Sequence, residues 1–157
     1  VLFHATIKVC LFLVAGSIIH NTGKTNVDEF DGIGKAMPKT LWAFTFAALA
    51  LIGIPPASGF FSKWYLAMGA LDSGMAVYSW LTPVVLLISA LLTAGYLLPV
   101  TVRGFFPGKD AVLPAKNDEG GWGMVAPIWI LAALTLLLGL CAGSMLGAME
   151  SLTASLF

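Results

Sequence analysis

Residues 41–63 read LWAFTFAALALIGIPPASGFFSK, and the interruption in the middle of this stretch decides how the chain folds. An apolar run from residue 41 to 54 meets Pro55-Pro56 and then Gly59. Proline removes a backbone donor and clashes with the preceding helical turn, so a continuous helix cannot pass. As one helix, residues 41–71 would be about 45 Å long, well over the roughly 30 Å of a bilayer core. The sequence therefore predicts one span followed by a second, discontinuous one.

The rest of the chain is equally apolar. Of its 157 residues 59% are hydrophobic and 10% are charged, whereas soluble domains carry about 25% charged residues. Three further runs, 1–20, 80–102 and 124–148, are each long enough to cross a bilayer. We therefore predict an all-α, polytopic transmembrane helix bundle with five crossings. The net charge of zero gives no sign of a basic surface that would bind nucleic acid, and the predicted surroundings are lipid.

Two polar segments separate these runs. Residues 21–39 and 103–121 hold three basic residues each, and the first contains a predicted short interfacial turn at 27–33. Five crossings place the two segments on opposite sides of the membrane. The positive-inside rule then gives no orientation, because the basic residues are evenly divided.

The chain begins at Val1 within an apolar run, without a basic leader, and we expect it to be the downstream piece of a longer chain.

Cys10 and Cys141 lie in apolar runs without CxxC spacing, which predicts buried, inert thiols. No nucleotide, dinucleotide, zinc or serine-hydrolase motif is present, so we expect no cofactor and no metal site. Any chemistry must reside inside the membrane.

Lys8 is the first candidate for that chemistry. A lysine near the middle of a membrane helix costs about 2.5–3.5 kcal/mol on insertion scales, and such groups are commonly functional. His4 lies one helical turn earlier, at the spacing that places both side chains on one face. An imidazole titrates near neutral pH, so His4 and Lys8 together are a candidate proton relay. The alternative is a structural lysine held by a carboxylate of another helix.

Lys63 is the second candidate. It follows the Pro55-Pro56 interruption by seven residues and precedes Asp72 by nine, which indicates a position deep in the membrane. Interrupted helices expose backbone groups that are tolerated there only inside protein or along a hydrated cavity, and transporters build ion sites at such places. The alternative is a surface turn at the prolines, with Lys63 reaching back to the interface.

Other residues are better explained by packing or solvation. Gly139, Gly143 and Gly147 recur every four residues and predict a smooth face for close helix packing. His20 ends the first predicted span and is expected at the interface. Glu150 is expected to be solvated.

Two motifs together resemble a known family. The first is HATIKVCLFLVAG, with His4 and Lys8; the second is GIPPASGFFSK, with Pro55, Pro56, Gly59 and Lys63. These resemble the signatures of the proton-conducting transporters shared by the antiporter-like subunits of respiratory complex I, multisubunit sodium/proton antiporters and membrane-bound hydrogenases. The resemblance covers roughly residues 1–106, and the region from Gly108 onward adds no signature.

The resemblance implies a fold and a function. Such subunits contain two inverted repeats with discontinuous helices, so this chain is expected to be the second repeat (1–106) followed by a loop and a C-terminal transmembrane helix (107–157). Lys8 and His4 are then expected on a central hydrated axis of lysines and histidines, and Lys63 on the second broken helix. The implied partners are other membrane subunits of a complex I-like, hydrogenase-like or antiporter complex in the cell membrane.

Three functional interpretations remain open at this point. The first is a proton- or cation-translocating subunit of a redox-driven complex that resembles NADH-quinone oxidoreductase, with the electron carriers in other subunits. The second is a subunit of a multisubunit sodium/proton antiporter, driven by an ion gradient. The third is a structural membrane anchor, which would gain nothing from carrying two buried lysines.

Overall fold

The computed structural model describes residues 1–108, 119–145, 147–148 and 151, and these residues form helices and short connections without any strand. The all-α prediction is confirmed for this part of the chain. The elements are α1 (Leu2–Thr22), the 3-10 turn η1 (Val27–Glu29), α2 (Ile33–Ala36), α3 (Pro38–Ile52), α4 (Ser58–Asp72), α5 (Ala76–Phe105) and α6 (Gly121–Leu140). Both η1 and α2 lie at the short turn expected near residues 27–33.

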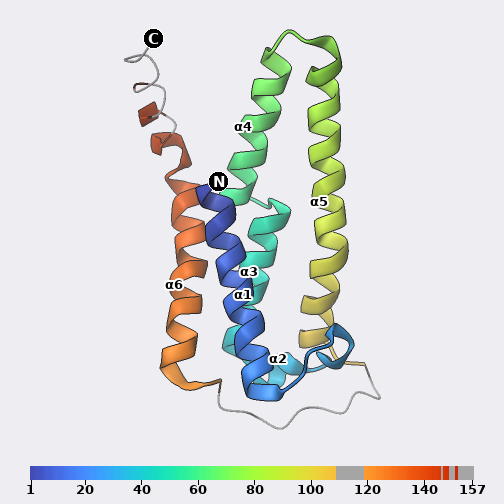
Figure 1. Ribbon diagram of the computed structural model, residues 1–157, viewed down its shortest axis with the longest axis vertical. Coiled ribbons are helices and arrows are strands. Elements are labelled where there is room, and N and C mark those ends of the chain that lie inside the picture. Colours follow the sequence, from blue (N-terminus) through green and yellow to red (C-terminus); the bar gives the residue numbers. More distant parts are fainter. Residues whose placement is uncertain (109–118, 146, 149–150, 152–157) are drawn as a thin grey trace.

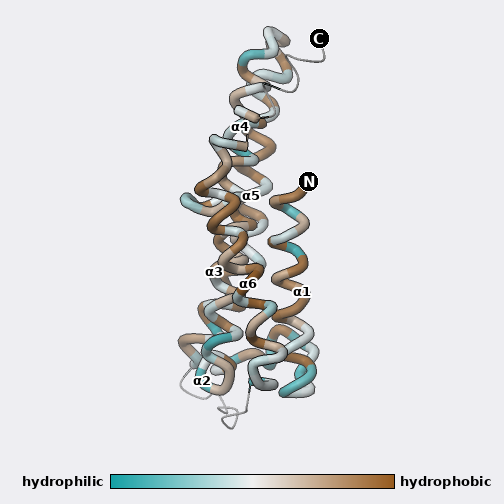
Figure 2. Tube along the Cα trace, turned by 90° about the vertical axis from the view of Figure 1, so that its left-hand side faces the viewer, coloured by the Kyte–Doolittle hydropathy of each residue, from teal (hydrophilic) through white to brown (hydrophobic). Residues whose placement is uncertain are grey.

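Three of these helices, α1, α5 and α6, are long and apolar enough to cross a membrane. Hydrophobic positions predominate along most of the helices, and hydrophilic positions are frequent at the end that carries α2 (Figure 2). The exposure is greatest on α5, where leucines, valines and isoleucines such as Leu87, Leu91 and Leu92 are more than half exposed. In water such a face would be unstable, whereas lipid or other membrane helices can cover it.

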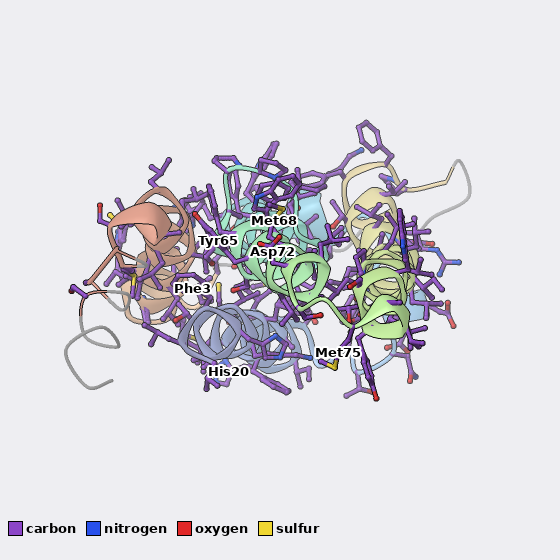
Figure 3. All side chains as sticks on the ribbon, turned by 90° about the horizontal axis from the view of Figure 1, so that it is seen from above. Phe3, His20, Tyr65, Met68, Asp72 and Met75 are labelled. Atoms are coloured by element: carbon purple, nitrogen blue, oxygen red, sulfur yellow. The ribbon has the colours of Figure 1, made fainter. Side chains whose placement is uncertain are left out.

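The helices α3 and α4 form one broken crossing. Figure 1 shows α3 running upward from α2 and α4 continuing in the same direction, while α5 returns alongside both. Seen from above, α4 lies over α3, between α6 on one side and α5 on the other (Figure 3). At 1.5 Å per residue each half is only about 22 Å long, too short to cross alone, and the two together match the length of α5, a single 30-residue candidate span that returns beside them. The discontinuous helix is confirmed, but the interpretation of 41–54 and 60–71 as two separate crossings is wrong.

This correction places both polar segments at the same end of the bundle. Arg103 pairs with Asp28 at 2.7 Å, and the backbone N–H of Gly32 donates to the Arg103 carbonyl. The carboxylate of Glu119 accepts the backbone N–H of Lys39 at 2.7 Å. Residues 21–39 and the described ends of 103–121 therefore meet, instead of lying on opposite sides. The physical reason is that α3 and α4 make one crossing, not two.

The last helix is interrupted before its predicted end, although the described residues 142–145 and 147–148 are helical. It ends at Leu140, eight residues before the predicted end at 148, and Cys141 forms a turn before Ala142–Met145, which are helical again. Cys141 is exposed, so the prediction of a buried thiol is wrong there, whereas Cys10 is fully buried. The reason is that Cys141 faces away from the other described helices, and an apolar run alone does not distinguish an outward-facing position from a core position. His20 is exposed in the last turn of α1, as expected.

The core lies between α1, α3 and α6. Its fully buried members include Ile7, Cys10 and Val14 of α1, and Ile128 of α6. The facing side of α3 is lined by alanines at 43, 47 and 50. Small side chains let membrane helices approach closely, which compensates for the missing hydrophobic drive between helices in lipid. This packing fixes the upper part of α1 against the place where α3 stops.

Candidate functional site: the helix break and Lys63

The helix break, residues 53–57, separates α3 from α4. Gly53 ends α3 with φ +98°, a left-handed conformation that is strained for any residue with a Cβ. Pro55 and Pro56 follow, and neither can donate a backbone hydrogen bond. The local sequence thus dictates both the end of α3 and the start of α4 at Ser58.

Two glycines allow the break to be packed tightly within the bundle. A Cβ on Gly59 would collide with the Ala50 carbonyl oxygen, so α4 crosses the end of α3 in backbone contact. A Cβ on Gly139 of α6 would collide with the Pro56 carbonyl oxygen and lie 2.7 Å from the Ser58 nitrogen. Backbone of α3 and α6 therefore contacts one side of the break, while Ile54, Pro55 and Pro56 are exposed on the other. Of the predicted glycine stripe only Gly139 makes such a contact, because a Cβ at residue 143 or 147 would have no heavy atom of the described chain within 4 Å.

Lys63 of α4 turns back onto the end of α3. Its ammonium Nζ donates to the Ile52 carbonyl at 2.6 Å and to the Leu51 carbonyl at 3.2 Å. Its side-chain stem lies against Gly53, where a Cβ would be 3.1 Å from the Lys63 Cδ. The last carbonyls of a helix carry about half a negative charge and have no helical donors, so a cation at this place is doubly favourable. Lys63 therefore caps α3 from the other side of the break.

A cavity of about 120 Å³ opens beside this ammonium. We call it the Lys63 cavity; it is lined by His4, Ile7, Ala50, Leu51, Gly59, Ser62 and Lys63. Such a volume holds several water molecules, and the imidazole, hydroxyl and carbonyl groups supply hydrogen-bond partners for them. His4 of α1, which is exposed, and Lys63 of α4, which is half-buried, thus line one small, partly open pocket beside the end of α3.

Lys8 lies elsewhere. It is half-buried on α1, one turn from His4 as predicted, but it does not line the Lys63 cavity. Within the described residues the ion pair found joins Arg103 to Asp28, so no described carboxylate holds Lys8. The hypothesis of a structural lysine paired with an acid finds no support in these residues.

The alternative for Lys63 is contradicted. A lysine that reached back to the interface would point its ammonium away from the break, whereas this ammonium is hydrogen-bonded to Leu51 and Ile52 beside it. The prolines are exposed, but they do not form a turn that reverses the chain, because α3 and α4 continue in one direction on either side of them (Figure 1).

Some groups at or near the site could not be predicted from the pattern of side chains in the sequence. The carbonyls of Leu51 and Ile52 are backbone groups and leave no residue signature. Glu119 is 8% exposed, and its Oε2 has no hydrogen-bond partner among the described residues while Oε1 accepts from the first turn of α3. An acid directly before the Gly120-Gly121 start of an apolar run was the one available signal. Ser58 is fully buried at the start of α4, and its hydroxyl likewise has no partner in the described chain.

Comparison with known proteins agrees with this geometry. Residues 1–93 match the family model described as "NADH:quinone oxidoreductase/Mrp antiporter, TM", which is more than half of the chain. The chain belongs to this transmembrane family. The match includes α1, the helix break and Lys63, so the features that form the Lys63 cavity all lie within the family's region.

Individual relatives come from both branches of the family. The chain is 40% identical over 151 residues to NADH-quinone oxidoreductase subunit N of Desulforudis audaxviator (strain MP104C), covering 89% of this chain and 29% of that protein. It is 34% identical over 134 residues to a Na(+)/H(+) antiporter subunit of Bacillus subtilis (strain 168), covering 85% and 26%. The chain therefore spans less than a third of these relatives.

A solved structure shares the fold. The Mrp complex from Dietzia sp. DQ12-45-1b contains a chain that superposes with a TM-score of 0.71 at 27% identity, covering 92% of this chain and 34% of that one. Together with the apolar helices, this family membership confirms a multi-pass integral membrane protein of the cell membrane, as the sequence predicted.

Proposed function

We propose that this chain is part of a proton- or cation-translocating membrane subunit of a multisubunit, redox-driven complex that resembles NADH-quinone oxidoreductase. Residues 1–106 contribute the second repeat of the transporter domain, and residues 107–157 the following loop and C-terminal transmembrane helix. Other membrane subunits are the partners. The redox centres belong to those partners, and this chain contributes groups that hold and release protons.

One observation carries this proposal: the Lys63 ammonium is held at the end of α3, beside a cavity that also contains His4. Three groups have roles in it. Lys63 exchanges a proton with water in the cavity, His4 accepts or donates a proton across the same space, and Lys8 continues the path along α1. Pro55, Pro56 and Gly59 keep the helix open at the point where this exchange takes place.

A subunit of a multisubunit sodium/proton antiporter is the second candidate. It is supported by the similarity to the Bacillus subtilis antiporter protein and to the Mrp complex chain. A purely structural anchor is disfavoured, because an anchor has no use for an ammonium held inside a helix break.

The test measures proton uptake by inverted membrane vesicles that contain the complete subunit with its partners. Vesicles are energised once by an electron donor and once by a sodium gradient. Lys63→Ala should lower uptake strongly while leaving assembly near normal. Lys35→Ala removes an exposed lysine of α2 and is the matched control, which should behave as the unmodified complex does.

Each outcome selects one interpretation. Donor-driven uptake that is lost in Lys63→Ala supports the redox-driven pump, and sodium-driven exchange that is lost supports the antiporter. Unchanged uptake under both conditions would remove Lys63 from the pathway and refute the proposed mechanism. A collapse of the assembled complex would instead assign Lys63 a structural role.

A further inference from the structure

The helix α3 is held at both ends by side chains from other segments of the chain. The first N–H groups and the last carbonyls of a helix have no partner within it. At the start of α3, the backbone N–H of Lys39 donates to the Glu119 carboxylate at 2.7 Å. At its end, the Lys63 ammonium donates to the Leu51 and Ile52 carbonyls. Glu119 lies just before α6 and Lys63 on α4, so these contacts join α3 to both segments.

Glu119 occupies its position at an energetic cost. It is 8% exposed, and its Oε2 has no hydrogen-bond partner among the described residues. Removing a carboxylate from water without pairing both oxygens is unfavourable. The Thr40 hydroxyl, in the same turn of α3, is also buried and lacks a partner in the described chain. A buried acid of this kind calls for a role, and the contact of its Oε1 with the Lys39 N–H supplies one.

The position of α3 along its own axis depends on such end contacts. Over the middle of the helix, the side that faces α1 and α6 carries alanines, at 43, 47 and 50. Small side chains let helices approach closely, but their low ridges resist sliding only weakly. From Lys39 to Leu51 the helix rises about 18 Å. No glycine or proline lies between these two residues, so α3 transmits a shift of one end to the other.

We propose that Glu119 is a positioning residue for Lys63. By holding the start of α3, Glu119 fixes the height of the Leu51 and Ile52 carbonyls, and so keeps them within hydrogen-bond distance of the Lys63 ammonium. The polar end of the bundle, where Glu119 lies, is thereby coupled to the helix break. The inference rests on the proposed function, since it takes Lys63 as the group that exchanges protons.

Two substitutions separate the reach of the Glu119 side chain from its charge. Glu119→Asp keeps the charge but is one methylene shorter, so its carboxylate draws back from the Lys39 N–H. Glu119→Gln keeps the length and an oxygen that accepts this N–H, but it loses the charge.

Positioning and charge predict opposite patterns of proton uptake per assembled complex in vesicles. If Glu119 acts by positioning, uptake should fall in Glu119→Asp by about twofold to thirtyfold, the range that corresponds to the loss of a helix cap. Uptake in Glu119→Gln should stay near that of the unmodified complex. The reverse pattern, or equal uptake in the two variants, overturns the proposal.

Hydrogen–deuterium exchange of the assembled complex in lipid nanodiscs tests the coupling without any transport. The N–H groups of Gly53 and Ile54 both donate to the Leu49 carbonyl at the far end of α3. Exchange in the segment that carries them should be faster in Glu119→Asp than in the unmodified complex, and unchanged in Glu119→Gln. A merely local cap would change exchange only in the first turn of α3, and that result also overturns the proposal.

Asp28→Ala is the control, because it removes the exposed partner of Arg103 at the same end of the bundle. It should leave uptake and exchange unchanged, and an effect equal to that of Glu119→Asp would overturn the specific role of Glu119. Unchanged uptake in Lys63→Ala would refute the proposed function. Loss of uptake in Lys63→Ala, together with normal uptake and exchange in Glu119→Asp, would refute this inference alone.

Discussion

Gly59→Ala tests whether the close contact between α4 and α3 is what positions Lys63. The added Cβ would collide with the Ala50 carbonyl oxygen, and this neighbour is backbone, which cannot rotate away. A carbon and a carbonyl oxygen in contact stand about 3.3–3.6 Å apart. The two helix ends must therefore separate by roughly 1 Å or more.

That separation acts directly on the Lys63 ammonium. A shift of this size lengthens its bonds to the Ile52 and Leu51 carbonyls, now 2.6 and 3.2 Å, to or beyond the limit of a hydrogen bond. Hydrogen bonds to charged groups are worth about 1.5–3 kcal/mol, and each 1.4 kcal/mol corresponds to about a factor of ten. We therefore expect proton uptake to fall about tenfold to a hundredfold, although glycine-to-alanine changes in helices usually stabilise them.

The matched control lies on the same helix. A Cβ on Gly69 meets no heavy atom of the described chain within 4 Å, so Gly69→Ala should stabilise α4 by up to about 1 kcal/mol and leave proton uptake unchanged. Uptake is measured in inverted vesicles and divided by the amount of assembled complex. Equal uptake per complex in Gly59→Ala and Gly69→Ala would refute the positioning argument.

Three further predictions concern other parts of the bundle. Gly139→Ala, which collides with backbone of the helix break, should destabilise the complex by about 1–3 kcal/mol, whereas Gly143→Ala should not; thermal unfolding of the two purified variants in parallel decides this. Glu119→Ala removes a carboxylate from the first turn of α3 and should lower stability by about 0.5–2 kcal/mol, seen as a lower denaturation midpoint; an unchanged midpoint would show that this contact is dispensable. The end that carries both polar segments holds four of the six basic residues that the structure describes, so this end should be cytoplasmic. A cysteine in place of Val27 (Val27→Cys) should then react with an impermeant maleimide only in inverted vesicles, and Ser73→Cys only in intact cells. The reverse pattern would contradict this orientation.

Much of this architecture is encoded locally and was predictable. Long apolar runs specify membrane helices because an unpaired backbone is intolerable in lipid, and consecutive prolines specify a break because they lack donors. The insertion penalty of a buried lysine likewise marks Lys8 and Lys63 as exceptional from sequence alone. All three arguments depend on a residue and its near neighbours, so one sequence is enough.

The tertiary structure decided how segments that are distant in the sequence are placed relative to one another. An apolar sequence looks the same whether the second helix continues in the direction of the first or reverses it. Only the packing of α3 and α4 along α5 therefore showed a single broken crossing. The same packing put the two polar segments at one end. It also showed that His4, and not Lys8, shares a cavity with Lys63. The partners of Lys63 are main-chain carbonyls, which every residue possesses, and only the folded chain determines which of them face a given side chain.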